Sequence, residues 1–239
     1  MAEPVRLFQY NTLGALMSGL YAGTMTIEEL LTHGDTGIGT LDSIDGELTI
    51  VDGKAYQATA TDGVLKVIEL DGTATVPYAA VVNHQAEVIF KQRFEMTSHE
   101  LYDRIETYYD GENLFRSIKI RGTFSKMAVR LIPKSKDGRK FAEVAANQPE
   151  FQKDEVSGTI VGFWTPEMFH GVALAGYHLH FISDDLSFSG HIMDFSILEG
   201  IVEIGPVDQL DQRFPVQDRQ YLFAKFNMEE LIDDINKVE

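Results

Sequence analysis

The sequence predicts an α+β fold made of two mostly antiparallel or mixed β-sheet halves with a few short helices. Two observations support this class: turn signals recur through the first 140 residues with short β-type segments between them, and helix-start signals are few. The turn signals are the dipeptides Asp45-Gly46, Asp52-Gly53, Asp62-Gly63, Asp71-Gly72, Asp110-Gly111 and Asp137-Gly138. A doubly wound fold would instead alternate strands with helices along the whole chain.

The first strands are predicted around two of these turns. Residues 48–51 and 55–59 are β-type segments separated by Asp52-Gly53, a dipeptide that favours a type I′ hairpin. Residues 64–68 follow the next Asp-Gly turn and predict a further strand.

Three helices are expected. Thr26 begins a segment of capping-box form that ends at Gly34, and Thr97 begins a second segment of the same kind. Residues 228–235 have amphipathic spacing and predict a short helix near the end of the chain. Residues 134–149 begin with a polar stretch and are expected to form a loop.

The length of 239 residues allows one large domain or two compact ones. We expect an N-terminal mixed β-sheet domain with helices over residues 1–125. Residues 126–239 are then expected to form a β-rich domain that carries a metal site and a C-terminal helix or tail.

The charge balance restricts the partners. Lys and Arg total 20 against 37 Asp and Glu, which gives a net charge of −17. Such a surface repels nucleic-acid phosphates and anionic lipid headgroups, so we expect neither as a partner. A small anionic substrate would need a local positive centre, such as a metal ion or a buried arginine.

Location and metal chemistry are restricted by three absences from the sequence: a membrane span, a secretory signal and cysteine. No stretch approaches the roughly 20 consecutive apolar residues of a membrane span, and the first residues lack the pattern of a secretory signal. A cytoplasmic protein is therefore expected. The sequence contains no cysteine, so any metal must be held by His, Asp or Glu.

Residues 176–195 contain the pattern most indicative of chemistry. His178 and His180 are two apart on a predicted strand and therefore share one face. The polar run 183–190 can turn the chain back, and pairing of Ile182 with His191 would place His191 on the same face, diagonally beside His180. Three imidazoles with an open fourth position are typical of a catalytic zinc site.

Other interpretations of these residues remain open. Each histidine could be an independently hydrogen-bonded strand residue, and Asp185 and its neighbour Asp184 could cap the hairpin or add ligands, with the turn position favouring the cap. The other four histidines lack such spacing and are expected to be surface or structural residues; they are His33, His84, His99 and His170.

The same region resembles the α-acetolactate decarboxylase family. The motifs that carry the resemblance are Gly-Tyr-His-Leu-His-Phe at residues 176–181, Ser-Gly-His at 189–191 and the segment 158–166 that ends in Phe-Trp-Thr-Pro. The other matching segments are residues 37–41, 45–48, 52–56, 113–115, 118–120 and 122–124. Ser189 departs from the family's usual glycine, at a turn position that should not disturb the third histidine.

The resemblance implies a homodimeric enzyme of acetoin biosynthesis that converts (S)-2-acetolactate to (R)-acetoin and carbon dioxide. It implies zinc on the three histidines and active-site roles for Thr40, Glu47, Arg130 and Glu239. From the residues alone, Glu47 could equally be an exposed turn residue, Arg130 could extend to solvent, and Thr40 could be an ordinary strand residue.

These residues suggest a mechanism without an organic cofactor. The zinc ion would act as a Lewis acid on an enediolate intermediate, Arg130 would bind the substrate carboxylate or the enediolate, and Glu47 would deliver a proton with help from Thr40. Two alternatives remain: another histidine-metal β-protein enzyme, such as a cupin-like enzyme or a zinc hydratase, or a binding module whose metal is structural.

Overall fold

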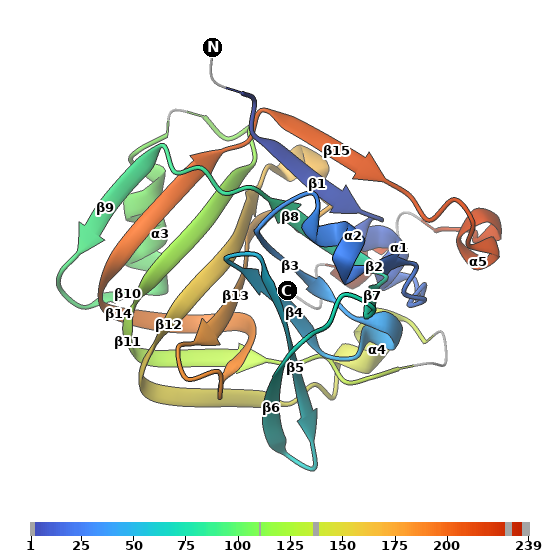
Figure 1. The fold of residues 1–239 in the computed structure, drawn as a ribbon, viewed down its shortest axis with the longest axis horizontal. Helices are drawn as coiled ribbons and strands as arrows, with labels where there is room; N and C mark the ends of the chain where they lie inside the picture. The colour runs from blue at the N-terminus through green and yellow to red at the C-terminus, as the bar shows by residue number, and fades with distance from the viewer. Residues whose placement is uncertain (1–2, 110, 136–138, 228–230, 236–239) are drawn as a thin grey trace.

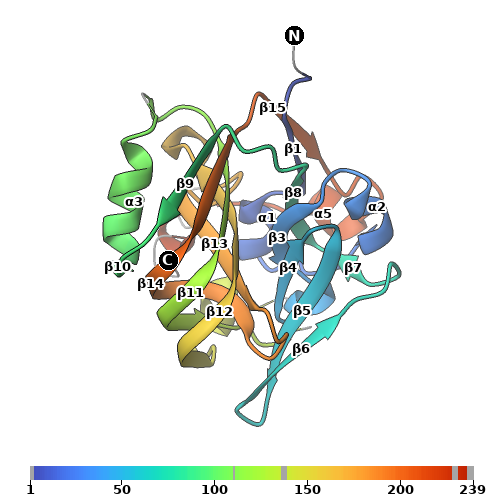
Figure 2. The same ribbon diagram turned by 60° about the vertical axis from the view of Figure 1, so that its left-hand side comes forward.

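The computed structural model describes residues 3–109, 111–135, 139–227 and 231–235, and two β-sheets packed side by side dominate it (Figures 1 and 2). The seven-stranded sheet has the order β15 (Gln209–Arg213), β1 (Arg6–Tyr10), β8 (Tyr78–Val82), β3 (Thr36–Thr40), β4 (Glu47–Val51), β5 (Lys54–Thr61) and β6 (Val64–Glu69). Its neighbouring strands are antiparallel except for the parallel pair β1 and β15.

The six-stranded sheet closes on itself. Its order is β10 (Met96–Thr97), β14 (Ser189–Pro206), β11 (Arg116–Arg130), β12 (Glu150–Thr165) and β13 (Gly176–Ser183), with β9 (Val88–Gln92) also paired to β14. All of these pairs are antiparallel. Since β13 also pairs with the first residues of β14, a ring of hydrogen-bonded strands forms around the end of the sheet where the histidines lie. A separate two-stranded sheet joins β2 (Met25–Thr26) and β7 (Thr75–Val76).

The described helices are short. They are α1 (Leu13–Met17), α2 (Ile27–Leu31), α3 (Ser98–Glu106), α4 (Phe141–Ala145) and α5 (Arg219–Phe223), with the 3₁₀ turns η1 (Asp42–Ile44) and η2 (Glu167–Phe169). Among the described helices, none is both long and apolar enough to cross a lipid bilayer. This mainly β structure with few short helices agrees with the predicted α+β class.

The local predictions around the Asp-Gly turns are confirmed. β4 and β5 form the first hairpin, and Asp52 and Gly53 have φ values of 51° and 76°, the positive values that a type I′ turn requires. Asp62 and Gly63 join β5 to β6 in the same way, with φ values of 52° and 77°.

The helix predictions are confirmed in part. Thr97 caps α3 in a full capping box, because its hydroxyl accepts from the Glu100 amide while the Glu100 carboxylate accepts from the Thr97 amide at 2.8 Å. The expected loop at 134–149 is wrong in one respect, because α4 lies within it. Of the predicted helix at 228–235, residues 231–235 are helical and the first three lie outside the described residues.

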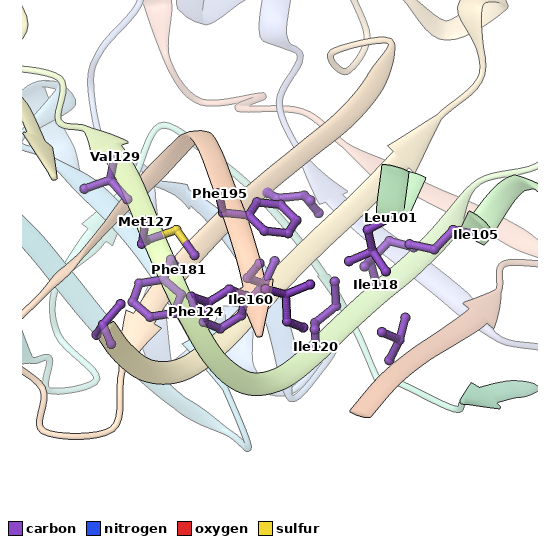
Figure 3. Packing of buried hydrophobic residues seen from close by; sticks show 14 of the residues in the cluster. Leu101, Ile105, Ile118, Ile120, Phe124, Met127, Val129, Ile160, Phe181 and Phe195 are labelled. Atoms are coloured by element: carbon purple, nitrogen blue, oxygen red, sulfur yellow. The ribbon is translucent and has the colours of Figure 1, made fainter. Parts of the chain in front are cut away.

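The main core lies between α3 and the curved six-stranded sheet. Leu101 and Ile105 of α3 are fully buried against strand residues of β11 and β14 (Figure 3). Phe124 packs edge-on against Phe181 and Phe195, with ring centroids 5.4 and 5.8 Å away. Such aromatic pairs add about 0.5–1.5 kcal/mol each beyond their burial. This core holds β11, β13 and β14, the strands that carry the candidate site, in a fixed register.

The expected division between residues 125 and 126 falls within strand β11. In addition, β15 from the C-terminal part of the chain pairs with β1 in the sheet that the N-terminal residues form. The division into two domains stays a prediction about folding units.

Candidate metal centre

The three predicted histidines lie together. One ring nitrogen from each of His178, His180 and His191 lies within 4.8 Å of the others, the only such metal-competent group among the described residues. His178 and His180 are two residues apart on β13 and therefore lie on the same face. His191 lies directly across from His180 on β14. The expected pairing of Ile182 with His191 is therefore wrong by two residues, since Ile182 pairs with Ser189. Because side chains alternate with a period of two, this shift leaves His191 on the predicted face.

His180 is held in one tautomer by the neighbouring sheet. Its Nδ1 donates a hydrogen bond to the backbone carbonyl of Leu48 in β4, at 2.8 Å. Its Nε2 must then carry a lone pair, and this buried atom has no hydrogen-bond partner. A metal-binding histidine is normally oriented in this way, with one nitrogen bonded to a carbonyl and the other free for the metal.

Burial keeps the three imidazoles neutral. Desolvation lowers the pKa of His180 from 6.5 to about 3, and it lowers the pKa values of His178 and His191 well below 6.5. The Arg130 charge lowers all three pKa values further. The 3.6 Å approach of His180 Nε2 to Glu47 Oε2 is therefore a contact with a neutral ring rather than an ion pair. Neutral imidazole is the form that binds a metal ion.

Arg130 ends β11 directly across from His191. Its Nη2 lies 3.1 Å from His191 Nε2, so the guanidinium reaches the histidine cluster instead of extending to solvent. It provides a positive charge at this point of a strongly acidic chain.

Glu47 and Thr40 reach the cluster from the other sheet. Glu47 is 9% exposed, which excludes the alternative of an exposed turn residue. Its Oε1 accepts a hydrogen bond from the Ile132 amide at 3.0 Å, while Oε2 faces His180. Thr40 lies directly across from Glu47 and donates a hydrogen bond to the Gly46 carbonyl at 2.7 Å.

The turn before Glu47 depends on Gly46. Gly46 has a φ of 78°, and a Cβ at this position would lie 2.0 Å from the backbone carbonyl oxygen of Ala58. Since that oxygen belongs to the paired strand β5, it cannot move aside without breaking the ladder. The close packing of this turn places Glu47 at the first position of β4 with its side chain toward the histidines.

We expect Gly46→Ala to destabilise the fold more than Gly53→Ala. Both glycines have a φ near +77°, so both substitutions carry the left-handed strain of about 1–2 kcal/mol. Only Gly46→Ala adds a backbone clash, because nothing lies within 4 Å of a Cβ at Gly53. Denaturant unfolding should show a loss of at least about 3 kcal/mol for Gly46→Ala. Equal losses in the two variants would contradict the clash.

A cavity of about 40 Å³ adjoins the cluster. Its wall includes His178, His191, Arg130, Glu47 and Thr40. The rest of the wall is mainly apolar and is formed by Leu13, Leu16, Met17, Gly39, Tyr78, Ile132, Phe141 and Gln148. The site is therefore a small pocket in which a few polar groups meet a mainly apolar wall.

These wall residues were not found from the sequence. The spacing of Leu13, Leu16 and Met17 after the capping residue Thr12 would have indicated helix α1. For Tyr78 and Gln148 the sequence holds no comparable signal.

The other residues singled out from the sequence that the structure describes lie outside the cluster. Asp185 caps the hairpin, which is the alternative that its turn position favoured. Its carboxylate accepts hydrogen bonds from Ser183 and Ser187, and these bonds hold the pKa of Asp185 well below the usual range. Glu239 lies outside the described residues. His33 stacks on Phe8, and His84 contacts Ser117.

Comparison with known proteins identifies the family. A family model described as alpha-acetolactate decarboxylase matches residues 7–228. The chain belongs to the alpha-acetolactate decarboxylase family. The resemblance predicted from the sequence motifs is thus confirmed.

Relatives in this family match the whole chain. The alpha-acetolactate decarboxylases of Streptococcus thermophilus and Lactococcus lactis subsp. cremoris are 70% and 64% identical over 239 residues, which is 100% of each chain. A Staphylococcus aureus structure, described as a protein of unknown function similar to alpha-acetolactate decarboxylase, matches with a TM-score of 0.93 and 40% identity over 98% of this chain and 100% of that chain. The alpha-acetolactate decarboxylase of Bacillus subtilis strain 168 matches with a TM-score of 0.92 and 30% identity, covering 98% and 99%.

Proposed function

We propose that this chain is a zinc-dependent decarboxylase that converts (S)-2-acetolactate to (R)-acetoin and carbon dioxide. The observation that carries the proposal is the meeting of three neutral imidazoles, of which two line a small cavity together with one guanidinium and the carboxyl group of Glu47. Membership of a family whose relatives are named for this reaction supports it. The adjoining cavity also favours a catalytic metal over a structural one, which would be closed by protein ligands.

The residues of the cluster fit a zinc ion. Imidazole nitrogens suit zinc, whereas magnesium and calcium prefer oxygen ligands. The buried Nε2 of His180 has no hydrogen-bond partner, which is costly unless the lone pair meets a ligand such as a cation. When bound, the ion would supply a Lewis acid that stabilises negative charge developing on the substrate oxygens.

Arg130 is proposed to bind either the substrate carboxylate or the enediolate that forms when carbon dioxide leaves. The guanidinium is permanently charged and presents a planar set of donors that matches two oxygens at once. Its place beside His191 allows the substrate to contact both groups. This charge also offsets the long-range repulsion of an anionic substrate by the net charge of −17.

Glu47 is proposed to donate the proton that completes the reaction. Cleavage of the bond to the carboxylate releases carbon dioxide and leaves its electron pair on the substrate as an enediolate. Protonation of one carbon by Glu47 then gives acetoin, and solvent returns the proton to Glu47. The Ile132 amide and the Thr40–Gly46 hydrogen bond fix the carboxylate on one side of the cavity. Delivery from one side would account for a single product enantiomer.

Glu239 is proposed to close the site from the C-terminal tail. Support comes from Leu231 and Ile235, which are buried in the same hydrophobic cluster as Leu13, Leu16 and Tyr78 of the cavity wall. The described part of the chain thus leads to the edge of the site. A homodimer is proposed from the family resemblance, and sedimentation of the purified protein would test the assembly.

We expect Arg130→Lys to lower kcat/KM at least about tenfold, which corresponds to about 1.4 kcal/mol. Lysine keeps the charge but loses the planar pair of donors. Steady-state acetoin formation measures the effect. Arg121→Lys is the matched control, since Arg121 is on the same strand but half exposed and paired with Asp52. Unchanged kinetics in Arg130→Lys would remove Arg130 from the substrate site.

Incubation of the purified protein with racemic acetolactate tests the proposed function. Acetoin should form, should stop after treatment with a chelator and should return with added zinc. Circular dichroism should show that the fold survives chelation. Unfolding on chelation would indicate a structural metal, and full turnover by metal-free protein would exclude the proposed role of zinc.

A further inference from the structure

A second, smaller cavity lies behind His178, between the two sheets. It measures about 10 Å³, and its wall is largely apolar, with Leu7 from one sheet, Phe163 from the other and Phe115 from the residue before β11. It shares His178 and Tyr78 with the larger cavity, so these side chains separate the two spaces. A volume of this size corresponds to a single water molecule.

Gln9 lines this cavity and carries an unpartnered polar atom. Its side chain is fully buried, and its amide nitrogen has three acceptors: the Asn11 carbonyl at 3.0 Å, the Val172 carbonyl at 2.8 Å and Gln212 Oε1 at 3.0 Å. These acceptors fix the orientation of the amide, because the reversed orientation would set its oxygen against three other oxygens. The Oε1 atom is buried and has no hydrogen-bond partner. A buried carbonyl oxygen is rarely left in this state.

The second ring nitrogen of His178 requires a hydrogen-bond partner if the first binds a metal ion. One of its ring nitrogens belongs to the metal-competent group, and the ring makes no hydrogen bond to any other residue that the structure describes. A metal-binding histidine usually donates its second ring N–H to a carbonyl, carboxylate or water, which sets the tautomer and the ring orientation. The Leu48 carbonyl has this role for His180.

We propose that one ordered water in the small cavity accepts a hydrogen bond from the ring N–H of His178 and donates one to Gln9 Oε1. This inference rests on the proposed zinc site and adds to it a positioning residue, Gln9, on the opposite sheet. Thr165 lines the same cavity, and its hydroxyl would be a third polar partner for the water, the usual number for a buried water. Gln9 then acts on the metal through His178 and touches neither metal nor substrate.

The first test is the zinc affinity of Gln9→Met. Methionine keeps the length of the side chain but has no strong acceptor, so the affinity should fall about 10- to 100-fold, as for other losses of a partner behind a metal ligand. Competition with a chromophoric chelator measures it. Gln212→Met is the matched control: Gln212 Oε1 is one of the three acceptors of the Gln9 amide nitrogen, so this variant disturbs the same network but leaves Gln9 Oε1 in place, and Gln212 does not line the cavity. Its zinc affinity should stay close to that of the wild type.

A second variant covers the case in which Gln9→Met fails to fold. Ala80→Val would fill the cavity from β8 while leaving the Gln9 amide in place, and it should weaken zinc binding by displacing the water. A high-resolution structure of the zinc-loaded wild type should show a water within hydrogen-bond distance of Gln9 Oε1 and a ring nitrogen of His178.

A dry cavity, or a Gln9→Met protein that binds zinc as tightly as Gln212→Met, would overturn the role of Gln9 while leaving the proposed function intact. A wild-type protein that binds no zinc would overturn both.

Discussion

Replacement of His178, His180 or His191 with alanine is expected to remove the bound zinc and nearly all acetoin formation. The other two imidazoles alone would hold the ion poorly, since a catalytic zinc is held by three protein ligands. Loss of a Lewis acid that contributes several kcal/mol corresponds to a fall in kcat of at least about 10³-fold. Metal analysis of the purified variants and an acetoin assay measure the two effects.

His99→Ala is the control for this series. His99 is exposed on α3, outside the cluster, so the same substitution should leave zinc content and turnover unchanged. A cluster variant that keeps full zinc and normal turnover would exclude that histidine from the site. Unfolding curves are needed for each variant, because His180→Ala also removes the hydrogen bond to Leu48.

Glu47→Gln is expected to lower turnover by roughly 10²–10⁴-fold, the range for a positioned acid–base group. Glutamine still offers an oxygen to the Ile132 amide, so the fold and the zinc content should be preserved. An amide cannot donate a proton as a carboxylic acid does, so protonation would come from solvent. The residual acetoin should therefore be less enantiomerically pure. Chiral chromatography of the product, together with the rate, tests both expectations.

The control for Glu47→Gln is Glu69→Gln. Glu69 is a half-exposed acid of the same sheet that pairs with Lys54. Its replacement removes one negative charge without approaching the histidines, so rate and chirality should not change. A normal rate with pure (R)-acetoin from Glu47→Gln would assign proton delivery to another group, such as Glu239.

The parts of the fold that could be predicted from the sequence are those decided by neighbouring residues. The Asp52-Gly53 hairpin and the Thr97 capping box depend on backbone conformation and hydrogen bonds within a few residues. The order of the strands depends on packing between distant segments. Nothing near residues 209–213 indicates that they pair in parallel with β1, and nothing in the sequence indicates that the predicted hairpin of β13 and β14 closes a ring through β11 and β12.

The candidate site also has a part that neighbouring residues determine and a part that depends on distant segments. The three histidines come from one hairpin, so alternation along the strand was enough to place them on one face, even with the pairing displaced by two residues. Thr40, Glu47 and Arg130 come from β3, β4 and β11, and only the family motifs pointed to them. Their roles stay predictions until the variants are measured, whereas their positions around one cavity are structural facts.

The hydrogen bond from His180 to the Leu48 carbonyl joins a proposed metal ligand on one sheet to the backbone of the other. The orientation of the His180 ring therefore depends on the docking of the two sheets. If only the docked state binds zinc, metal occupancy and docking are linked equilibria. At a free zinc concentration 1,000 times the dissociation constant, this linkage would stabilise the docked state by about 4 kcal/mol. Changes in sheet docking would in turn affect zinc binding. A substitution that loosens the packing between the sheets would weaken zinc binding from a distance, so stability and metal affinity would have to be selected together.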